Sequence, residues 1–392
     1  MMSEPNASQK QLLDLLMQWH IKKDKPIFVY SGPPGSGKTW VIRLFFEKLG
    51  ITPDEFVTCA FAGKAVTVLA RNGLPAKTIH SLIYYPVFKK IETEDGKFHY
   101  EFTFVKKESL DPKLKYIVVD ELSMVNDTIM HDLLSFGIPV IGMGDINQLP
   151  PVFGESSFML RPDFCLNEIM RQVKDSPIIK LSQMVLHDEP LLYGSYGNCN
   201  VLRNMKLDNS IIKNYDMILC GKNTTRDFIN SFVRHNIYGI KTDNPVIMDK
   251  VVCKQNEWDR CVNDMYLTNG TVGYINDIFE ESINDKRATI DFTPEYNRKS
   301  VYYNVDMDLK YITSPYETRK EMGFTKFTKF EYAYAITTHS SQGSEYDRIL
   351  YIDEAIGGGR DKIKKLKYTA ISRAVNQIDI VNGYNLLNYY LN

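Results

Sequence analysis

Residues 32–39 have the sequence Gly-Pro-Pro-Gly-Ser-Gly-Lys-Thr, whose residue types and spacing suit the binding of phosphate groups. The glycines let backbone N–H groups approach phosphates closely at the N-terminus of a helix. The pattern G-x-x-x-x-G-K-[ST] places Lys38 at the β- and γ-phosphates and the hydroxyl of Thr39 on Mg²⁺. We therefore predict that ATP and Mg are cofactors. The predicted contacts are Gly32, Pro33, Pro34, Gly35, Ser36, Gly37, Lys38 and Thr39.

Two further polar segments follow apolar runs and could complete the chemistry of phosphoryl transfer. Asp120 and Glu121 come directly after residues 116–119, so Asp120 suits Mg²⁺ coordination and Glu121 can orient and deprotonate the attacking water. Gln148 lies in a later loop, where its neutral amide could sense a terminal phosphate while the loop touches a second ligand. Acidic pairs and proline-containing turns also occur on ordinary surfaces, so both assignments depend on the phosphate-binding loop.

These segments need a frame that places them at one edge of a sheet. Short apolar runs at residues 27–30, 116–119 and 138–142 predict buried parallel strands, and apolar residues at helical spacing predict a helix at 41–49. Glycine-rich or acidic turns follow the runs, which is typical of a doubly wound α/β sheet. Residues 217–220 begin a second α/β series.

Two segments depart from the α/β pattern. Residues 84–111 alternate aromatic, basic and β-branched side chains around an Asp-Gly turn signal, which predicts an inserted β-hairpin or an ordinary surface hairpin. Residues from about 276 to 330 contain short strands without a good helix between them and predict a small inserted β-subdomain. We expect two domains, residues 1–190 and 191–392, each with one insertion.

The composition describes a soluble globular chain, with 44% hydrophobic and 24% charged residues. No apolar stretch approaches the roughly 18 residues of a membrane span, and the first ten residues lack a signal-peptide core, so we expect a cytoplasmic location and no membrane partner. The six cysteines include no C-x-x-C pair, which argues against a zinc site or a disulfide framework. With 47 basic and 48 acidic residues, any affinity for nucleic acid must come from a local basic groove.

The segments 120–125 and 144–152 resemble, in order and spacing, motifs of the superfamily 1 helicases, and specifically of group B, the branch that contains the phage Dda and bacterial RecD enzymes. The resemblance extends from Gln9 to Ala374 and includes nucleotide motifs in both halves of the chain. It implies an α/β fold of two RecA-like P-loop domains. The hairpin would be the family's pin in the first domain, and the β-subdomain would be a small β-barrel-like (SH3-like) insertion in the second.

The resemblance also implies roles that no local pattern identifies. Arg171 and Arg373 match motifs whose arginines reach the γ-phosphate, and Glu345 falls on the nucleotide side of its motif. Gln9 matches a glutamine that binds adenine, although it could also be a solvated residue of a first helix. Ser340 stands where many relatives have lysine, so one phosphate contact of the family has no counterpart here. The implied catalytic residues are Glu121, Gln148, Arg171 and Arg373.

The same comparison implies a path for a single strand. Hydroxyls, a lysine and backbone N–H groups would position phosphates without recognising sequence. Phe98 follows the hairpin turn and would abut the separating base pair, or would only pack within the hairpin. The implied nucleic-acid contacts are Phe61, Lys64, Thr78, His80, Phe98, Pro151, Asn223, Thr338 and His339.

Together these motifs imply an ATP-dependent DNA helicase that translocates 5′ to 3′ on single-stranded DNA and unwinds duplex junctions. It would act as a monomer in a bacterial or phage-infected cell, with replication or recombination proteins as candidate partners. Three alternatives stay open. They are a translocase or protein-displacing motor without unwinding, an RNA track, and a P-loop ATPase that serves as a regulatory or remodelling switch.

Overall fold

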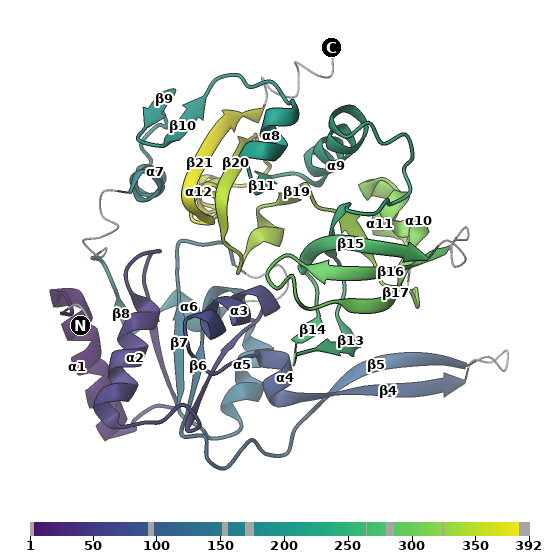
Figure 1. Cartoon of the computed structure of the whole chain (residues 1–392). Helices are drawn as coiled ribbons and strands as arrows, with labels where there is room; N and C mark the ends of the chain where they lie inside the picture. The colour runs from purple at the N-terminus through teal and green to yellow at the C-terminus, as the bar shows by residue number, and fades with distance from the viewer. Residues whose placement is uncertain are drawn as a thin grey trace. The chain divides into compact units, whose positions relative to one another are not determined.

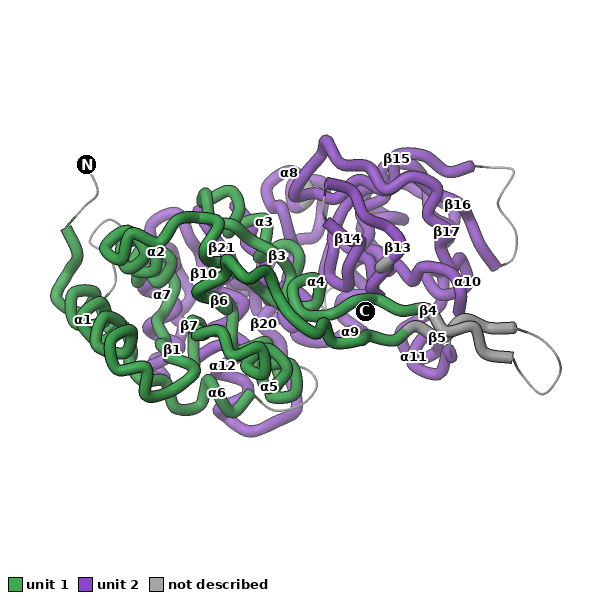
Figure 2. The backbone as a smooth tube through the Cα atoms, turned by 90° about the horizontal axis from the view of Figure 1, so that it is seen from below, with its two compact units in different colours: residues 1–146, 150–174 green, residues 147–149, 175–392 purple. Residues whose placement is uncertain are grey.

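The structure, a computed structural model, describes residues 4–92, 98–150, 156–168, 176–263, 265–279, 286–323 and 325–383, without the side chains of residues 88–92, 98–102, 212 and 258. The chain forms two compact units (Figure 2). Unit 1 comprises residues 1–146 and 150–174, and unit 2 comprises residues 147–149 and 175–392. Among the described residues, no helix is both long and apolar enough to cross a membrane.

Unit 1 is built on a parallel sheet whose strands, within its described residues, follow the order β3-β2-β6-β7-β1-β8 (Figure 1). The strands are β1 (Ile27–Ser31), β2 (Phe56–Ala60), β3 (Ala76–Thr78), β6 (Tyr116–Val119), β7 (Val140–Gly144) and β8 (Phe164–Cys165). All residues of β2, β6 and β7 are buried. Burial on both faces explains why these strands are continuous apolar or small-residue runs instead of alternating patterns.

One helix precedes the strands of unit 1, and shorter ones connect them. The helices are α1 (Ala7–Lys22), α2 (Lys38–Leu49), α3 (Gly63–Arg71), α4 (Ile79–Ile83), α5 (Asp127–Leu134) and α6 (Ser157–Leu160), with a 3₁₀ turn at Leu122–Met124. The strands β4 (Tyr84–Glu92) and β5 (Phe98–Lys106) pair antiparallel, with Tyr84 opposite Lys106 and Glu92 opposite Phe98. This ladder directly follows α4 in the chain, so its base is continuous with the segment that contains Thr78 and His80.

Unit 2 contains a second α/β layer. Its described sheet has the order β19-β11-β20-β21-β10-β9, parallel except for β9. The strands are β9 (Gly194–Tyr196), β10 (Cys199–Leu202), β11 (Met217–Cys220), β19 (Ala335–Thr337), β20 (Tyr346–Asp353) and β21 (Ala374–Asn382). The helices around it are α7 (Pro177–Leu186), α8 (Asn209–Asn214), α9 (Asn223–Phe232) with a further turn at Val233–Ile237, and α12 (Arg360–Ile371).

An antiparallel sheet forms the other part of unit 2, with the described order β17-β16-β15-β12-β18. Its strands are β12 (Lys250–Cys253), β15 (Val272–Phe279), β16 (Arg287–Pro294), β17 (Tyr302–Asp308) and β18 (Phe330–Tyr332). The hairpin of β13 (Glu257–Val262) and β14 (Met265–Leu267) and the helices α10 (Leu309–Thr313) and α11 (Tyr316–Glu321) accompany it. The sheet extends past the expected segment of about 276–330 at both ends: β12 and the start of β15 precede it, and β18 continues beyond it to Tyr332.

The division between the units also differs from the expected boundary at residue 190. Ile178, Leu181 and Val185 of α7 are buried in the same hydrophobic cluster as Met217 and Ile349 of unit 2. The helix therefore belongs to unit 2, which resumes at Asp175. A boundary placed at a Gly- and Asn-rich stretch overlooks a helix whose apolar face packs on the strands that follow it.

Candidate functional site

The segment 32–39 forms the turn from β1 into α2. Gly35 and Gly37 have φ angles of 76° and 81°, in the left-handed region that glycine adopts without a steric cost. A Cβ on Gly32 would lie 2.5 Å from Ser36 Oγ and 3.0 Å from Leu166 Cβ, so the tight turn has no room for a larger residue. The result is a tight, mostly half-buried loop at the N-terminus of the 12-residue helix α2.

The polar side chains of this loop are Ser36, Lys38 and Thr39. Lys38 Nζ donates to the carbonyl oxygens of Gly32 at 2.6 Å and Pro33 at 3.3 Å, which holds the ammonium over the loop. The hydroxyl of Ser36 is buried without a hydrogen-bond partner among the described residues. Thr39 lies in the first turn of α2, next to Lys38. A cation, N–H groups of a helix start and a hydroxyl together fit a polyphosphate with its metal ion.

Gln9 lies against this loop. Its Nε2 donates to the carbonyl oxygen of Ser36 at 2.9 Å, while its Oε1 accepts from the backbone N–H of Asn6 at 3.1 Å. Asn6 in turn accepts from Gln9 N at 2.8 Å, so the two residues form a capping box at the start of α1. The Gln9 amide therefore ties α1 to the loop, and its contact with adenine stays a prediction.

Asp120 and Glu121 follow the buried strand β6. Glu121 has a φ of 51°, a left-handed conformation unusual for this residue type, and its N–H donates to Asp120 Oδ1 at 2.8 Å. Since β6 and β1 belong to one parallel sheet, their carboxyl ends lie at the same edge. Burial, and after it the charge of Asp120, raises the pKa of Tyr30 in β1 well above its ordinary value. Asp120 thus acts electrostatically on the strand that leads into the phosphate-binding loop.

The donor types at this edge fit a nucleotide-bound Mg²⁺, which takes one or two protein oxygens beside phosphate oxygens. The hydroxyl of Thr39 and the carboxylate of Asp120 are such donors. No group of three or more His, Cys, Asp or Glu in the described part of the chain could hold a metal by itself.

Four of the expected nucleic-acid residues of unit 1 lie beyond two neighbouring strands. Ala60 of β2 pairs with Thr78 of β3, so Phe61 and Lys64 follow one strand and His80 the other at the same edge. The rings of Phe61 and His80 are 5.5 Å apart in an edge-to-face arrangement. The structure therefore brings together two segments separated in sequence.

Thr78 and His80 differ in their contacts within this cluster. The Thr78 hydroxyl caps α4 by accepting from Ser81 N at 3.2 Å. The ring of His80 also packs against those of Tyr84 and Phe104, at 5.6 and 5.0 Å. Burial lowers the pKa of His80 from 6.5 to about 4, so its imidazole is neutral at pH 7. His80 can hydrogen-bond a strand or pack against it, but it brings no positive charge.

Gln148 belongs to a short segment, Asn147–Leu149, that packs within unit 2. The backbone N–H of Leu149 donates to Thr369 Oγ1 at 3.0 Å, and the carbonyl oxygen of Leu149 accepts from Gln342 Nε2 at 2.8 Å. Gln148 is buried, and its Oε1 has no hydrogen-bond partner among the described residues. An unpaired buried amide oxygen is costly, which favours a donor from a ligand at this position.

Arg373 and Glu345 lie close together in unit 2. Arg373 is buried, and its guanidinium donates to Ser344 O at 3.4 Å and to Ser372 Oγ at 3.2 Å. Glu345, the residue after Ser344, is exposed. An arginine finger at this position would therefore have to exchange hydrogen bonds within unit 2 for phosphate oxygens.

Asn223, Thr338 and His339 follow two neighbouring parallel strands, β11 and β19. Thr338 is fully buried, and its hydroxyl donates to the carbonyl oxygen of Cys220 at 3.3 Å. Burial, and after it the charge of Lys362, lowers the pKa of His339. Thr338 is thus a structural residue of this edge, whereas Asn223 and His339 are partly exposed there.

Arg226 and Asn230, which follow Asn223 in α9, are buried within unit 2. Arg226 donates to Glu331 Oε2 at 2.7 Å, and both side chains are almost fully buried. Asn230 Nδ2 donates to the carbonyl oxygens of Tyr332 and Ala335 at 2.7 and 3.0 Å. These two side chains are therefore engaged within unit 2, whereas Thr224 and Ser231 of the same helix are exposed.

Three of the expected residues cannot be placed. Arg171 and Pro151 lie outside the described residues, and so does the side chain of Phe98, although its backbone begins β5.

Glu354 is a prominent residue of unit 2 that the sequence analysis missed. Its carboxylate accepts hydrogen bonds from Gly221 N and Lys222 N, both at 2.8 Å, and from Thr225 Oγ1 at 2.6 Å. It therefore caps the N-terminus of α9. The available signal was the acidic pair of Asp353 and Glu354 at the end of an apolar run, the same pattern that identified Asp120.

Comparisons with known proteins agree with this geometry. A family model described as an AAA domain matches residues 19–154. The chain is 30% identical over 179 residues to the ATP-dependent RecD2 DNA helicase of Deinococcus radiodurans, covering 43% of this chain and 23% of that protein. It is 27% identical over 277 residues to the ATP-dependent DNA helicase dda of Enterobacteria phage T4, covering 63% and 60%. The chain resembles the superfamily 1 group B helicases of the Dda and RecD type.

A solved helicase structure shares the fold of this chain. The structure of the Pif1 helicase from Bacteroides in complex with ADP-AlF3 and single-stranded DNA matches with a TM-score of 0.51 at 16% identity, over 100% of this chain and 97% of that one. The chain spans well under two thirds of the RecD2 protein and 60% of Dda. The α/β fold with its central parallel sheet is therefore shared with Pif1 helicases.

Proposed function

We propose that this chain is an ATP-dependent DNA helicase that moves 5′ to 3′ on single-stranded DNA and unwinds duplexes. The observation that supports the proposal most directly is the loop 32–39, in which Lys38 is held by two loop carbonyls above left-handed glycines. The relatives RecD2 and Dda are named as ATP-dependent DNA helicases, and the Pif1 structure contains a nucleotide and single-stranded DNA.

In this proposal each unit is a RecA-like domain that supplies part of the ATP chemistry. The loop N–H groups and Lys38 bind the β- and γ-phosphates, Gln9 lies beside the base, and Glu121 orients and deprotonates the attacking water. Thr39 and Asp120 would hold Mg²⁺, which neutralises charge on the phosphates when it is bound. Gln148, Arg171 and Arg373 contact the γ-phosphate, with Glu345 next to Arg373. The positive charge of the two arginines and the amide N–H donor of Gln148 would stabilise the transferred phosphoryl group.

The DNA contacts occupy the carboxyl edges of the parallel strands in each unit. Phe61 offers a ring for base stacking beside the neutral His80, and Lys64 and Thr78 position phosphates. Asn223, His339 and Pro151 would make the remaining contacts, and the buried Thr338, expected from its motif to lie near DNA, would hold this edge in place through its bond to Cys220. The β4–β5 hairpin acts as a pin at the duplex junction through Phe98, and the antiparallel sheet of unit 2 is the SH3-like insertion.

The test is the ATPase rate of the purified chain with and without single-stranded DNA, followed by unwinding of duplexes with a 5′ or a 3′ tail. Lys38→Ala should abolish DNA-stimulated hydrolysis, because it removes the ammonium from the phosphates. Lys48→Ala is the matched control, since Lys48 is exposed at the other end of the same helix.

The outcomes separate the candidate functions. Stimulation by DNA and opening of only the 5′-tailed duplex would support the proposal. Stimulation without opening of either duplex would indicate a translocase. Stimulation by RNA alone would indicate an RNA track. An ATPase rate that is the same with and without nucleic acid would refute the helicase assignment and leave a P-loop switch as the function.

A further inference from the structure

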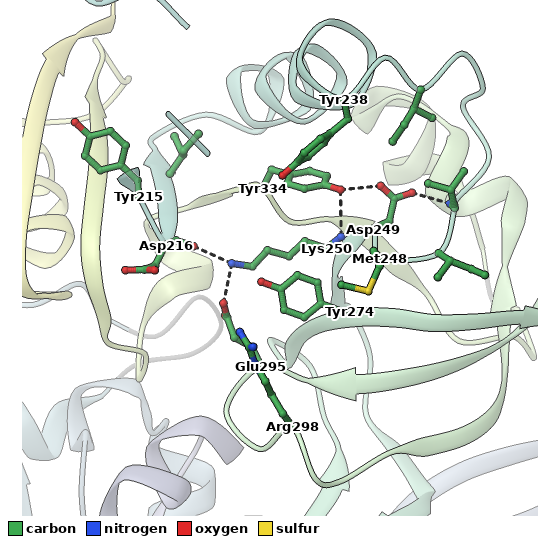
Figure 3. Close-up of a pocket in the computed structure, with 14 residues that line it drawn as sticks. Tyr215, Asp216, Tyr238, Met248, Asp249, Lys250, Tyr274, Glu295, Arg298 and Tyr334 are labelled. Carbon is green, nitrogen blue, oxygen red and sulfur yellow. Dashed lines mark hydrogen bonds and ion pairs between the residues drawn. The ribbon is translucent and has the colours of Figure 1, made fainter. Parts of the chain in front are cut away.

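Unit 2 contains a cavity of about 510 Å³ that lies apart from the residues discussed so far (Figure 3). Asp216 and Ile218 contribute from the amino end of β11, while Lys250 and Tyr274 contribute from β12 and β15. Asn223, by contrast, follows the carboxyl end of β11. The cavity therefore opens at the end of the parallel strand opposite to the candidate DNA contacts of this unit.

Tyrosine rings dominate the walls of the cavity. The ring centroids of Tyr238 and Tyr334 are 5.6 Å apart, and Tyr334 is fixed because its hydroxyl donates to Asp249 Oδ1 at 2.8 Å. Tyr238 is 47% exposed, so its ring is available to a ligand. Tyr274 lies on the side of Lys250 away from Tyr334 (Figure 3), and the Arg298 guanidinium is 6.0 Å from its centroid. Such rings favour a flat aromatic ligand.

The polar groups of the cavity include both donors and acceptors. Lys250 is only 7% exposed, and its Nζ donates to Asp216 O at 2.8 Å and to Glu295 Oε1 at 2.9 Å. The other carboxylate oxygen, Glu295 Oε2, is buried and has no hydrogen-bond partner among the described residues. Arg298 is exposed and forms no ion pair within the described chain. A ligand could donate to Glu295 and accept from Arg298.

The charges of the lining favour a neutral ligand. The acidic residues are Asp216, Asp249 and Glu295, and the basic ones are Lys250 and Arg298. Two of these acids have arginine partners outside the lining: Asp249 pairs with the buried Arg234 at 3.1 Å, and Asp216 lies 3.8 Å from Arg348. Glu295 pairs with Lys250, so Arg298, which is exposed to solvent, is the lining charge that has no ion pair in the described chain. The buried charges are therefore balanced, and a neutral ligand with donors and acceptors would leave them so.

We propose that this cavity binds a nucleobase, presented either by a free nucleoside or by an unpaired nucleotide of a strand. A nucleobase is flat and neutral, and it has N–H donors and N or C=O acceptors along its edge. Its faces would stack on the tyrosines, while its edge would donate to Glu295 and accept from Arg298. The proposal does not depend on ATP hydrolysis or on unwinding.

The test is binding of cytidine and adenosine to the full chain, measured by saturation-transfer NMR with the phosphate-binding loop saturated by a non-hydrolysable ATP analogue. We expect saturable binding that Tyr238→Ala weakens about tenfold, the scale of one lost stacking contact. Tyr303→Ala is the matched control, because Tyr303 is 64% exposed and does not line the cavity. Arg298→Gln should also weaken binding, with Lys299→Gln as its exposed neighbour control.

A second arm identifies the source of the base. A single strand that contains 5-iodouracil should crosslink to Tyr238 or Tyr274 if the base comes from a strand, and nucleoside binding alone would indicate a free ligand. The proposal fails if neither occurs, or if Tyr238→Ala and Tyr303→Ala behave alike. It also fails if indole, which is flat but lacks an acceptor edge, binds as tightly as cytidine. That result would indicate an aromatic side chain of a partner protein instead.

Discussion

His80 illustrates how burial decides the chemistry of a single side chain. Its ring packs among those of Phe61, Tyr84 and Phe104, and burial lowers its pKa from 6.5 to about 4. The folded chain therefore disfavours the imidazolium, whereas the unfolded chain accepts a proton near pH 6.5. At this residue the unfolded state binds more protons between these two pH values, so the contribution of His80 to stability rises with pH over that range.

The expected result is a loss of unfolding free energy as the pH falls from about 6.5 towards 4, with part of this loss absent in His80→Gln. The measurement is the denaturant midpoint of both proteins at several pH values. His187→Gln, at an exposed position, should keep the pH dependence of the unsubstituted chain. Parallel curves for His80→Gln and the unsubstituted chain would show that burial of this histidine has no energetic effect.

Other residues of the site show what a sequence pattern can and cannot predict. The positions of Lys38 and Asp120 after buried strands follow from apolar runs and turn signals, which are local. The hydrogen bonds from Gln9 to Ser36 and from Gln342 to Leu149 join segments far apart in sequence, so only the folded chain can supply them. Local patterns therefore placed these candidate residues after their strands but left the partners of their side chains open.

At the scale of elements, the same distinction explains the errors in the fold. The buried strands β1, β6, β7 and β11 were predicted to within a few residues, because continuous apolar runs flanked by turns identify them. The extent of the antiparallel sheet was underestimated, since β12 joins it through pairing with β15 and β18 and not through any feature of its own four residues. Helix α7 was placed before the expected boundary at residue 190, although it belongs to unit 2. The residues that it packs against lie later in the chain, so the sequence around the helix does not reveal them.

Glu354 supports a prediction about the element that it caps. It accepts three hydrogen bonds at the start of α9, from Gly221, Lys222 and Thr225. Glu354→Ala would leave two backbone N–H groups without their acceptor and remove a negative charge from a helix N-terminus. We expect a loss of about 1 to 3 kcal/mol in the unfolding free energy of unit 2, measured by denaturant titration.

Two comparisons restrict the interpretation of this variant. Glu189→Ala, which removes an exposed carboxylate elsewhere in unit 2, should leave the midpoint nearly unchanged. The affinity of the loop 32–39 for an ATP analogue should stay the same, because that loop belongs to unit 1. A midpoint equal to that of the unsubstituted chain would mean that water replaces the carboxylate at no cost.

At the scale of the whole molecule, charge is the property that constrains DNA binding. The formal net charge is −1, so the chain as a whole does not attract a polyanion. Binding must then come from individual cations at the candidate contact edges, and each phosphate that they neutralise releases counterions. For single strands, log K should fall with log salt at a slope of about −0.7 per neutralised phosphate.

Lys64, near the N-terminus of α3, is the cation of unit 1 that we place on this path. Lys64→Gln should weaken binding of a labelled oligothymidylate and reduce the magnitude of the salt slope by about 0.7, measured by fluorescence anisotropy between about 50 and 200 mM salt. Lys48→Gln has the same charge change at an exposed position of α2 and should alter neither quantity. Because both variants have equal net charge, a difference between them can only reflect where the charge lies. An equal effect of the two substitutions would instead mean that the overall field, and not a defined path, governs the affinity.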